Sequence, residues 1–186
     1  RAKLDEPYRT MLGHVRHEAG HYYEWQLVEK NPERLTRARE LFGDETADYD
    51  EAIQRHYSEG PPANWSLSHI STYATMHPYE DFAETWAHYL HIVDTLGTAG
   101  AYGLRLRPDV DQAGELATRI DFDSYRGQTI EALVDAWTPL TLAVNSLNRS
   151  MGLADLYPFV LSTPVITKLG FVHDLIASAQ TTGRNG

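Results

Sequence analysis

The chain is patterned for helices almost throughout. Apolar residues recur at intervals of three and four, strict period-2 alternation is almost absent, and Pro or Gly marks most of the breaks. The pattern predicts helices over residues 7–29, 32–42, 46–57, 78–96, 129–150 and 164–180, and a helix or half-helix over 66–76. We therefore expect a mainly α-helical fold of about seven or eight helices, with little or no β-sheet. The Gly-rich and charged stretch 97–112 is predicted to be irregular.

The two most strongly patterned segments are the first helix and the helix over 78–96. In the first helix the apolar spacing is carried by Met11, Leu12, Val15, Ala19 and Tyr22. In the second, one apolar stripe is formed by Tyr79, Phe82, Ala83, Trp86, Leu90 and Val93. A separate stripe within about 80° of arc contains Glu80, Glu84, His88 and His91.

Length and composition indicate one folded domain over residues 1–186. The formal net charge of −10 argues against nucleic acid or an anionic membrane as a partner. There is no cysteine, so disulfides and thiolate metal sites are excluded. No apolar run approaches the length of a membrane span. We expect a cytoplasmic protein. The sequence leaves the oligomeric state open. The first residues lack both an initiator Met and an apolar leader, so we expect an N-terminally truncated chain.

The first predicted helix contains the sequence His17-Glu18-Ala19-Gly20-His21, an H-E-x-x-H motif. Histidines at i and i+4 lie about 40° apart on one helix face, so both imidazoles can bind one Zn²⁺. Glu18 is then placed to accept a proton from a metal-bound water. The alternative interpretation is a solvated helix that happens to carry two histidines.

A catalytic zinc needs a third protein ligand and an open fourth position, and spacing allows three placements to be compared. The extended metzincin pattern requires Gly at 24 and His at 27, where this chain has Glu24 and Leu27. Glu40 has a thermolysin-like spacing but lies among charges near a helix end. Glu80 is favoured over both because it lies in the first turn of the amphipathic helix.

Within that helix, Glu84 follows Glu80 by one turn and can accept a hydrogen bond from a ligand histidine. The simpler alternative for Glu84, His88 and His91 is exposed ion pairing at i,i+4 spacing.

His17-Glu18-x-x-His21 followed by Tyr73-x6-Glu80 and Glu80-Asp81-Phe82-Ala83-Glu84 resembles the gluzincin peptidases of the lethal-factor type. That resemblance implies that His17, His21 and Glu80 are zinc ligands and that Glu18 is the base. It further implies that Tyr73 is the electrophilic helper and that Glu84 supports a ligand. The alternative for Tyr73 is a packed aromatic residue.

The runs from Ala83 to His91 and from Leu147 to Gly152 are similar to a bacterial family of zinc-binding metallopeptidases, over most of the chain. That family often carries an N-terminal zinc ribbon, and we expect the ribbon or an upstream sheet to be missing from this chain.

The sequence thus predicts a zinc-dependent peptidase acting on a peptide or protein. The alternatives are a non-catalytic zinc-binding or protein-interaction domain derived from a peptidase, and a helical adaptor without metal.

Overall fold

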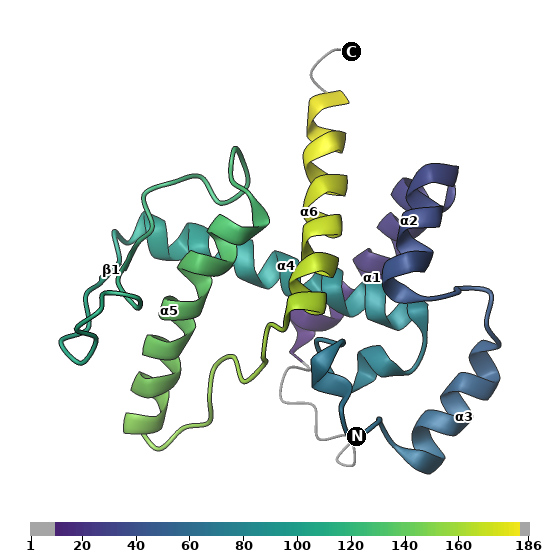
Figure 1. Cartoon of the computed structure of the whole chain (residues 1–186), viewed down its shortest axis with the longest axis horizontal. Helices are drawn as coiled ribbons and strands as arrows, with labels where there is room; N and C mark the ends of the chain where they lie inside the picture. Colours follow the sequence, from purple (N-terminus) through teal and green to yellow (C-terminus); the bar gives the residue numbers. More distant parts are fainter. Residues whose placement is uncertain (1–9, 183–186) are drawn as a thin grey trace. The chain divides into compact units, whose positions relative to one another are not determined.

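The computed structural model describes residues 10–182, with side chains up to residue 179, and it is mainly α-helical as predicted (Figure 1). The helices are α1 (Met11–Glu24), the π-helix η1 (Trp25–Glu29), α2 (Pro32–Phe42), α3 (Tyr49–Glu59), the 3-10 helices η2 (Trp65–Leu67) and η3 (Tyr73–Thr75), α4 (Pro78–Ala101), α5 (Ile130–Ser150) and α6 (Thr163–Thr182). Two short antiparallel strands, β1 (Arg105–Leu106) and β2 (Thr118–Arg119), pair Arg105 with Arg119. The predicted helix start at residue 7 lies outside the described residues.

The chain forms two compact units, residues 1–90 with 160–186 and residues 91–159. The first unit encloses the fully buried side chains Val28, Ile70, Phe82, Ala83, Tyr89, Val165, Leu169 and Val172. The second encloses Ile92, Val93, Leu96, Ile120, Leu133, Trp137 and Leu140. The organisation of residues 1–186 as a single domain stays a prediction.

Side-chain caps determine where the first helices begin. Thr10 accepts a hydrogen bond from the Gly13 backbone N–H at the start of α1, and Asn31 does the same for α2. The helix predicted over 46–57 begins later than expected, because Asp48 caps α3. The Thr46 hydroxyl donates to Asp44 Oδ1 at 2.7 Å and so belongs to the preceding turn.

Of the helix or half-helix predicted over 66–76, the structure forms only the single turns η2 and η3. Ser71 Oγ accepts a hydrogen bond from the Ala74 backbone N–H at 3.1 Å. Such a local side-chain bond competes with the helical hydrogen-bond ladder and favours a turn. The segment therefore folds as two turns that present Ser71 and Tyr73 to the start of α4.

The predicted end of the helix over 78–96 is too early, because α4 continues to Ala101. Glycine within a helix normally weakens it, which is why the Gly-rich sequence after Leu96 indicates a break. Within residues 91–159, however, a Cβ at Gly100 would lie 3.2 Å from the Ile120 carbonyl oxygen. The glycine is thus required for close packing of the strand region against the helix.

Gly20 brings α1 and α4 into close contact within the first unit. A Cβ at Gly20 would lie 2.8 Å from the Ala83 Cα and 3.1 Å from the Trp86 Cβ. Only a residue without a side chain allows the two helix backbones to approach this closely. Since Gly20 directly precedes His21, and Ala83 directly precedes Glu84, this contact aligns the polar residues of both helices.

The apolar row of α1 is exposed in the described structure. Met11 is 81% exposed, Val15 57% and Tyr22 55%, whereas the buried face of α1 consists of Gly13, His17, Gly20 and Glu24. The predicted helical period is therefore correct, but the small and polar residues of α1 are buried and its apolar residues are exposed. This inversion places ionisable side chains of α1 against α4.

A buried ion pair fixes the first turn of α4 to α6. Lys168 Nζ lies 2.5 Å from Asp81 Oδ2 and donates a second hydrogen bond to the Ser68 carbonyl at 2.7 Å. Both charged side chains are almost completely buried, at 6% and 1% exposure. Since Asp81 adjoins Glu80, the pair also restrains the position of Glu80.

Glu24 is a buried carboxyl group, 6% exposed, whose Oε2 has no hydrogen-bond partner. Burial, together with the negative charges of Glu29, Glu45, Glu80 and Asp81, raises the pKa of Glu24 to about 9. The folded state therefore keeps a proton that the unfolded chain releases above its ordinary pKa of 4.5. The stabilising contribution of that proton is complete below the unfolded pKa and is lost as the pH rises toward 9.

We therefore expect Glu24→Gln, which cannot ionise, to remove this pH dependence. As the pH is raised from 5 to 7, the free energy of unfolding of the variant should increase by about 2–3 kcal/mol relative to that of the parent protein. Urea unfolding of both metal-free proteins at several pH values measures the difference. A difference that stays constant with pH would show that Glu24 is ionised in the fold.

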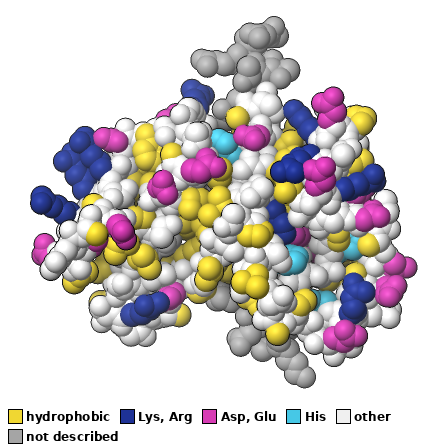
Figure 2. Space-filling view, viewed as in Figure 1, with side chains coloured by type: hydrophobic (Ala, Val, Ile, Leu, Met, Phe, Trp, Pro, Cys, Tyr) yellow, Lys and Arg dark blue, Asp and Glu magenta, His cyan; other side chains and the backbone are white. Residues whose placement is uncertain are grey.

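On the face shown in Figure 2, acidic and basic side chains are interspersed, and the basic ones drawn there do not gather into one patch. Within residues 10–182, no helix combines the length and the apolar content needed to cross a bilayer.

Candidate metal centre

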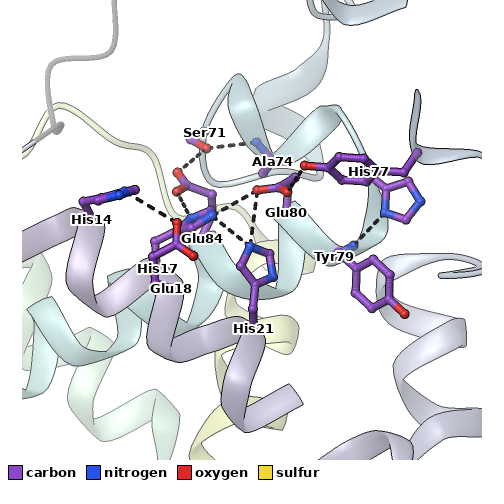
Figure 3. Close-up of polar contacts among 11 residues, drawn as sticks. His14, His17, Glu18, His21, Ser71, Ala74, His77, Tyr79, Glu80 and Glu84 are labelled. Carbon is purple, nitrogen blue, oxygen red and sulfur yellow. Dashed lines mark hydrogen bonds and ion pairs between the residues drawn. The ribbon is translucent and has the colours of Figure 1, made fainter. Parts of the chain in front are cut away.

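Three of the predicted site residues converge on one point in the first unit, with His17 and His21 on α1 and Glu80 in the first turn of α4. The Nε2 atoms of His17 and His21 lie 3.1 Å apart. Glu80 Oε2 lies 3.0 Å from His17 Nε2 and 3.7 Å from His21 Nε2. Figure 3 shows both imidazoles and the carboxylate pointing toward one another. Among the described residues, this trio is the group of acidic and histidine side chains whose geometry can hold a metal ion.

The spacing of these three atoms matches the demands of a small tetrahedral cation. Ligands at about 2.0–2.1 Å from a tetrahedral zinc are separated from one another by roughly 3.3–3.4 Å. The observed separations of 3.0, 3.1 and 3.7 Å bracket that value. The trio therefore fits a metal ion of this size with little movement of any side chain.

The electrostatics of the trio also favour a positive charge. Glu80 Oε2 is buried and, despite its 3.0 Å distance from His17 Nε2, makes no hydrogen bond of acceptable geometry. Burial would lower the pKa of His17, but the close contacts of its ring nitrogens with the Glu80 and Glu84 carboxylates, and the charges of those carboxylates, outweigh it and raise the pKa to about 9. Burial opposes ionisation of Glu80 as well, yet His17, His21 and Tyr49 hold its pKa well below the usual range. A cation and a proton thus compete for this site.

Glu84 and Ser71 orient the His17 ring. The Nδ1 atom of His17 lies 2.7 Å from Glu84 Oε1, and Ser71 Oγ donates to Glu84 Oε2 at 2.7 Å. A carboxylate that accepts the Nδ1–H of an imidazole leaves the lone pair of Nε2 free for a metal ion. Burial opposes ionisation of Glu84, but chiefly the His17 hydrogen bond lowers its pKa. The ring of His17 is therefore held in the tautomer that a metal ligand needs.

Glu18 differs from the trio in being open to solvent, with a side chain 57% exposed. Its Oε1 lies 3.7 Å from Nδ1 of His14, one turn earlier on α1 (Figure 3). Glu18 directly follows His17 on α1, but its carboxylate is not part of the trio. This position suits a group that exchanges protons with water or substrate.

Tyr73 also reaches the site, although on the turn η3 and not on a regular helix. The centroid of its ring lies 5.8 Å from that of His17. Ser71, which precedes Tyr73 by two residues, bonds both Glu84 and the backbone of the same turn. The turn that carries Tyr73 is thereby tied to the residue that orients His17.

Sequence reasoning missed two residues, Ser71 and Tyr49. The Tyr49 hydroxyl donates to Glu80 Oε1 at 2.7 Å from the start of α3. Burial and the hydrogen bond to Glu80 raise the pKa of Tyr49 well above its ordinary value, while a hydrogen bond with Tyr73 acts in the opposite direction. The hydroxyl therefore stays protonated and acts as a donor. For Ser71, its nearness to Tyr73 in the sequence is a signal that could have indicated a role. The sequence holds no such signal for Tyr49.

Two alternatives from the sequence do not fit the structure. Glu40 is more than half exposed and pairs with Arg37 on the surface of α2. Exposed ion pairing is the wrong interpretation of His88 and His91, because both are buried, at 3% and 7% exposure. Burial lowers the pKa of His88 to about 4, against the opposing charge of Glu84, so His88 is neutral in the fold.

Comparison with known proteins agrees with this geometry. The model of a family described as "putative zinc-binding metallo-peptidase" matches residues 1–175. The chain belongs to this family. The predicted resemblance to a family of zinc-binding metallopeptidases is thereby confirmed. Among curated proteins, the chain is 47% identical to uncharacterized proteins of Mycobacterium bovis and of two Mycobacterium tuberculosis strains.

Each of these alignments covers 95% of this chain and 49% of the relative, so the chain spans about half the length of the curated relatives it matches. No solved structure matches the chain.

Proposed function

We propose that this protein is a zinc-dependent peptidase of the gluzincin type, with His17, His21 and Glu80 as the metal ligands. The observation that carries the proposal is the mutual separation of their three ligand atoms, 3.0–3.7 Å, around a buried carboxylate oxygen without a hydrogen bond. Membership of the zinc-binding metallo-peptidase family supports the same metal and the same class of reaction. The gluzincin subtype is supported by the third ligand, a glutamate from a second helix.

Each residue around the proposed metal site has its own role in peptide hydrolysis. Zinc held there would supply a Lewis acid that lowers the pKa of a coordinated water and polarises the scissile carbonyl. Glu18 accepts a proton from the attacking water and passes it to the leaving amine. Tyr73 donates a hydrogen bond to the oxygen on which negative charge develops. Glu84 keeps the His17 ring in the required tautomer.

The exposure of Glu18 favours a catalytic site over a purely structural one. A structural zinc site is closed by four protein ligands, whereas a catalytic site has three and an open position. The described residues bring three ligand atoms together, and the neighbouring carboxylate of Glu18 is accessible to solvent. A structural site would have no use for an accessible base at that position.

The proposal is tested with purified protein, by elemental analysis and by mass-spectrometric mapping of cleavage in a diverse peptide mixture. We expect one zinc per chain and peptide hydrolysis that a chelator abolishes and added Zn²⁺ restores. Stoichiometric zinc without any cleavage would favour the non-catalytic zinc-binding alternative. Absence of metal binding would contradict both.

A further inference from the structure

Tyr49 contacts the candidate metal site, but the proposed function assigns it no role. It is the first residue of α3, and Asp48, which caps this helix, immediately precedes it. The Tyr49 hydroxyl nevertheless reaches a buried carboxylate on α4, donating to Glu80 Oε1 at 2.7 Å. Such a contact between two helix starts, 31 residues apart in the chain, needs both helices to be held in position.

His77 holds the Tyr49 ring in place. Its Nε2 lies 3.0 Å from the carbonyl oxygen of Ala47, two residues before Tyr49. Its ring packs edge-on against that of Tyr49, with centroids 5.1 Å apart and planes at 67°. At the start of α4, His77 Nδ1 accepts a hydrogen bond from the Tyr79 backbone N–H (Figure 3). His77 thus couples the beginning of α3 to the beginning of α4.

The two oxygens of Glu80 have different surroundings as a result. Oε1 accepts the hydrogen bond of Tyr49, whereas Oε2 faces His17 Nε2 and His21 Nε2 without a hydrogen bond. A carboxylate can bind a cation through one oxygen or through both, and binding through both occupies an additional coordination position. Zinc in peptidases needs that position for water and substrate.

We infer that Tyr49 is a positioning residue, whose hydroxyl retains Glu80 Oε1 so that Glu80 binds the metal through Oε2 alone. The inference rests on the proposed metal site, and it adds the residue that keeps one coordination position open.

The test is Tyr49→Phe, which removes one hydroxyl and keeps the ring packed against His77. Tyr102→Phe, at a tyrosine that is 82% exposed, is the matched control. Zinc affinity is measured by competition with a chelator, and coordination is read from crystal structures of the zinc-loaded proteins. Thermal melting of the metal-free variants reports their folding.

In the parent protein and in Tyr102→Phe we expect one Glu80 oxygen on zinc. In Tyr49→Phe we expect affinity to fall about 10–100-fold, the usual loss for a partner of a metal ligand. We also expect both Glu80 oxygens on the metal, or the carboxylate rotated. Where cleavage is measurable, kcat should fall more than KM rises.

Unchanged affinity together with single-oxygen coordination in Tyr49→Phe would overturn the inference. A parent protein that binds zinc without cleaving peptides would count against the proposed activity alone, since affinity and coordination still report on Tyr49. A parent protein that binds no zinc would overturn both proposals.

Discussion

Glu18→Gln should retain one zinc per chain and lose at least about two orders of magnitude in the rate of peptide hydrolysis, the usual scale for a general acid–base group. The amide has nearly the shape of the carboxylate but cannot accept the proton of the attacking water. Because Glu18 is exposed and lies outside the ligand trio, the substitution should leave metal affinity and thermal stability unchanged. Steady-state kinetics and elemental analysis of the same sample measure both properties.

Glu115→Gln, at an exposed glutamate in residues 91–159, is the matched control and should be as active as the parent protein. Full turnover by Glu18→Gln would exclude Glu18 as the base. Loss of zinc from that variant would instead indicate that Glu18 supports the metal site, and the assigned roles would have to be revised.

Glu80→Ala should lower zinc affinity by more than 100-fold, beyond the roughly 10–100-fold typical of residues that only support a ligand. The substitution leaves two histidines, which cannot hold a catalytic zinc on their own. It also removes one of the two carboxylates that raise the pKa of His17 in the metal-free protein. Competition with a chelator measures the affinity, and hydrolysis should disappear at zinc concentrations that saturate the parent protein.

Glu40→Ala is the control for this experiment, because the sequence also allows Glu40 as a third ligand. Its exposed pairing with Arg37 predicts unchanged zinc affinity. If Glu80→Ala kept its zinc through a chelator challenge while Glu40→Ala lost it, the ligand assignment would be wrong.

The histidine pair and its partner Glu80 could be found from the sequence because their signals are local. An H-E-x-x-H spacing fixes two imidazoles on one helix face whatever surrounds the helix. The polar stripe that contains Glu80 and Glu84 is likewise a property of a single helix. The structure brings these residues together, while their catalytic and metal-binding roles stay predictions.

Features that depend on contacts between distant segments could not be predicted in this way. Tyr49 has no sequence pattern that relates it to Glu80, since their contact requires the starts of α3 and α4 to meet. The burial of His88 depends on the packing around α4, which helical period alone does not reveal. The exposed apolar row of α1 shows the same limit, because periodicity identifies a face without saying which neighbour covers it.

The helix predicted over 66–76 did not form for a different reason. Apolar spacing there is compatible with a helix, but the Ser71 hydroxyl bonds the local backbone and ends it. Gly20 is the opposite case, a residue of low helix propensity inside a helix. Its role became clear only from the 2.8 Å that would separate its Cβ from the Ala83 Cα.

The most direct test of the metal site is a crystal structure of the protein grown with zinc, with anomalous data collected on both sides of the zinc absorption edge. We predict a single strong peak within coordination distance of His17 Nε2, His21 Nε2 and Glu80 Oε2, with a fourth position taken by solvent. A well-occupied zinc peak elsewhere, or one from which the Glu80 carboxylate is turned away, would contradict the assignment.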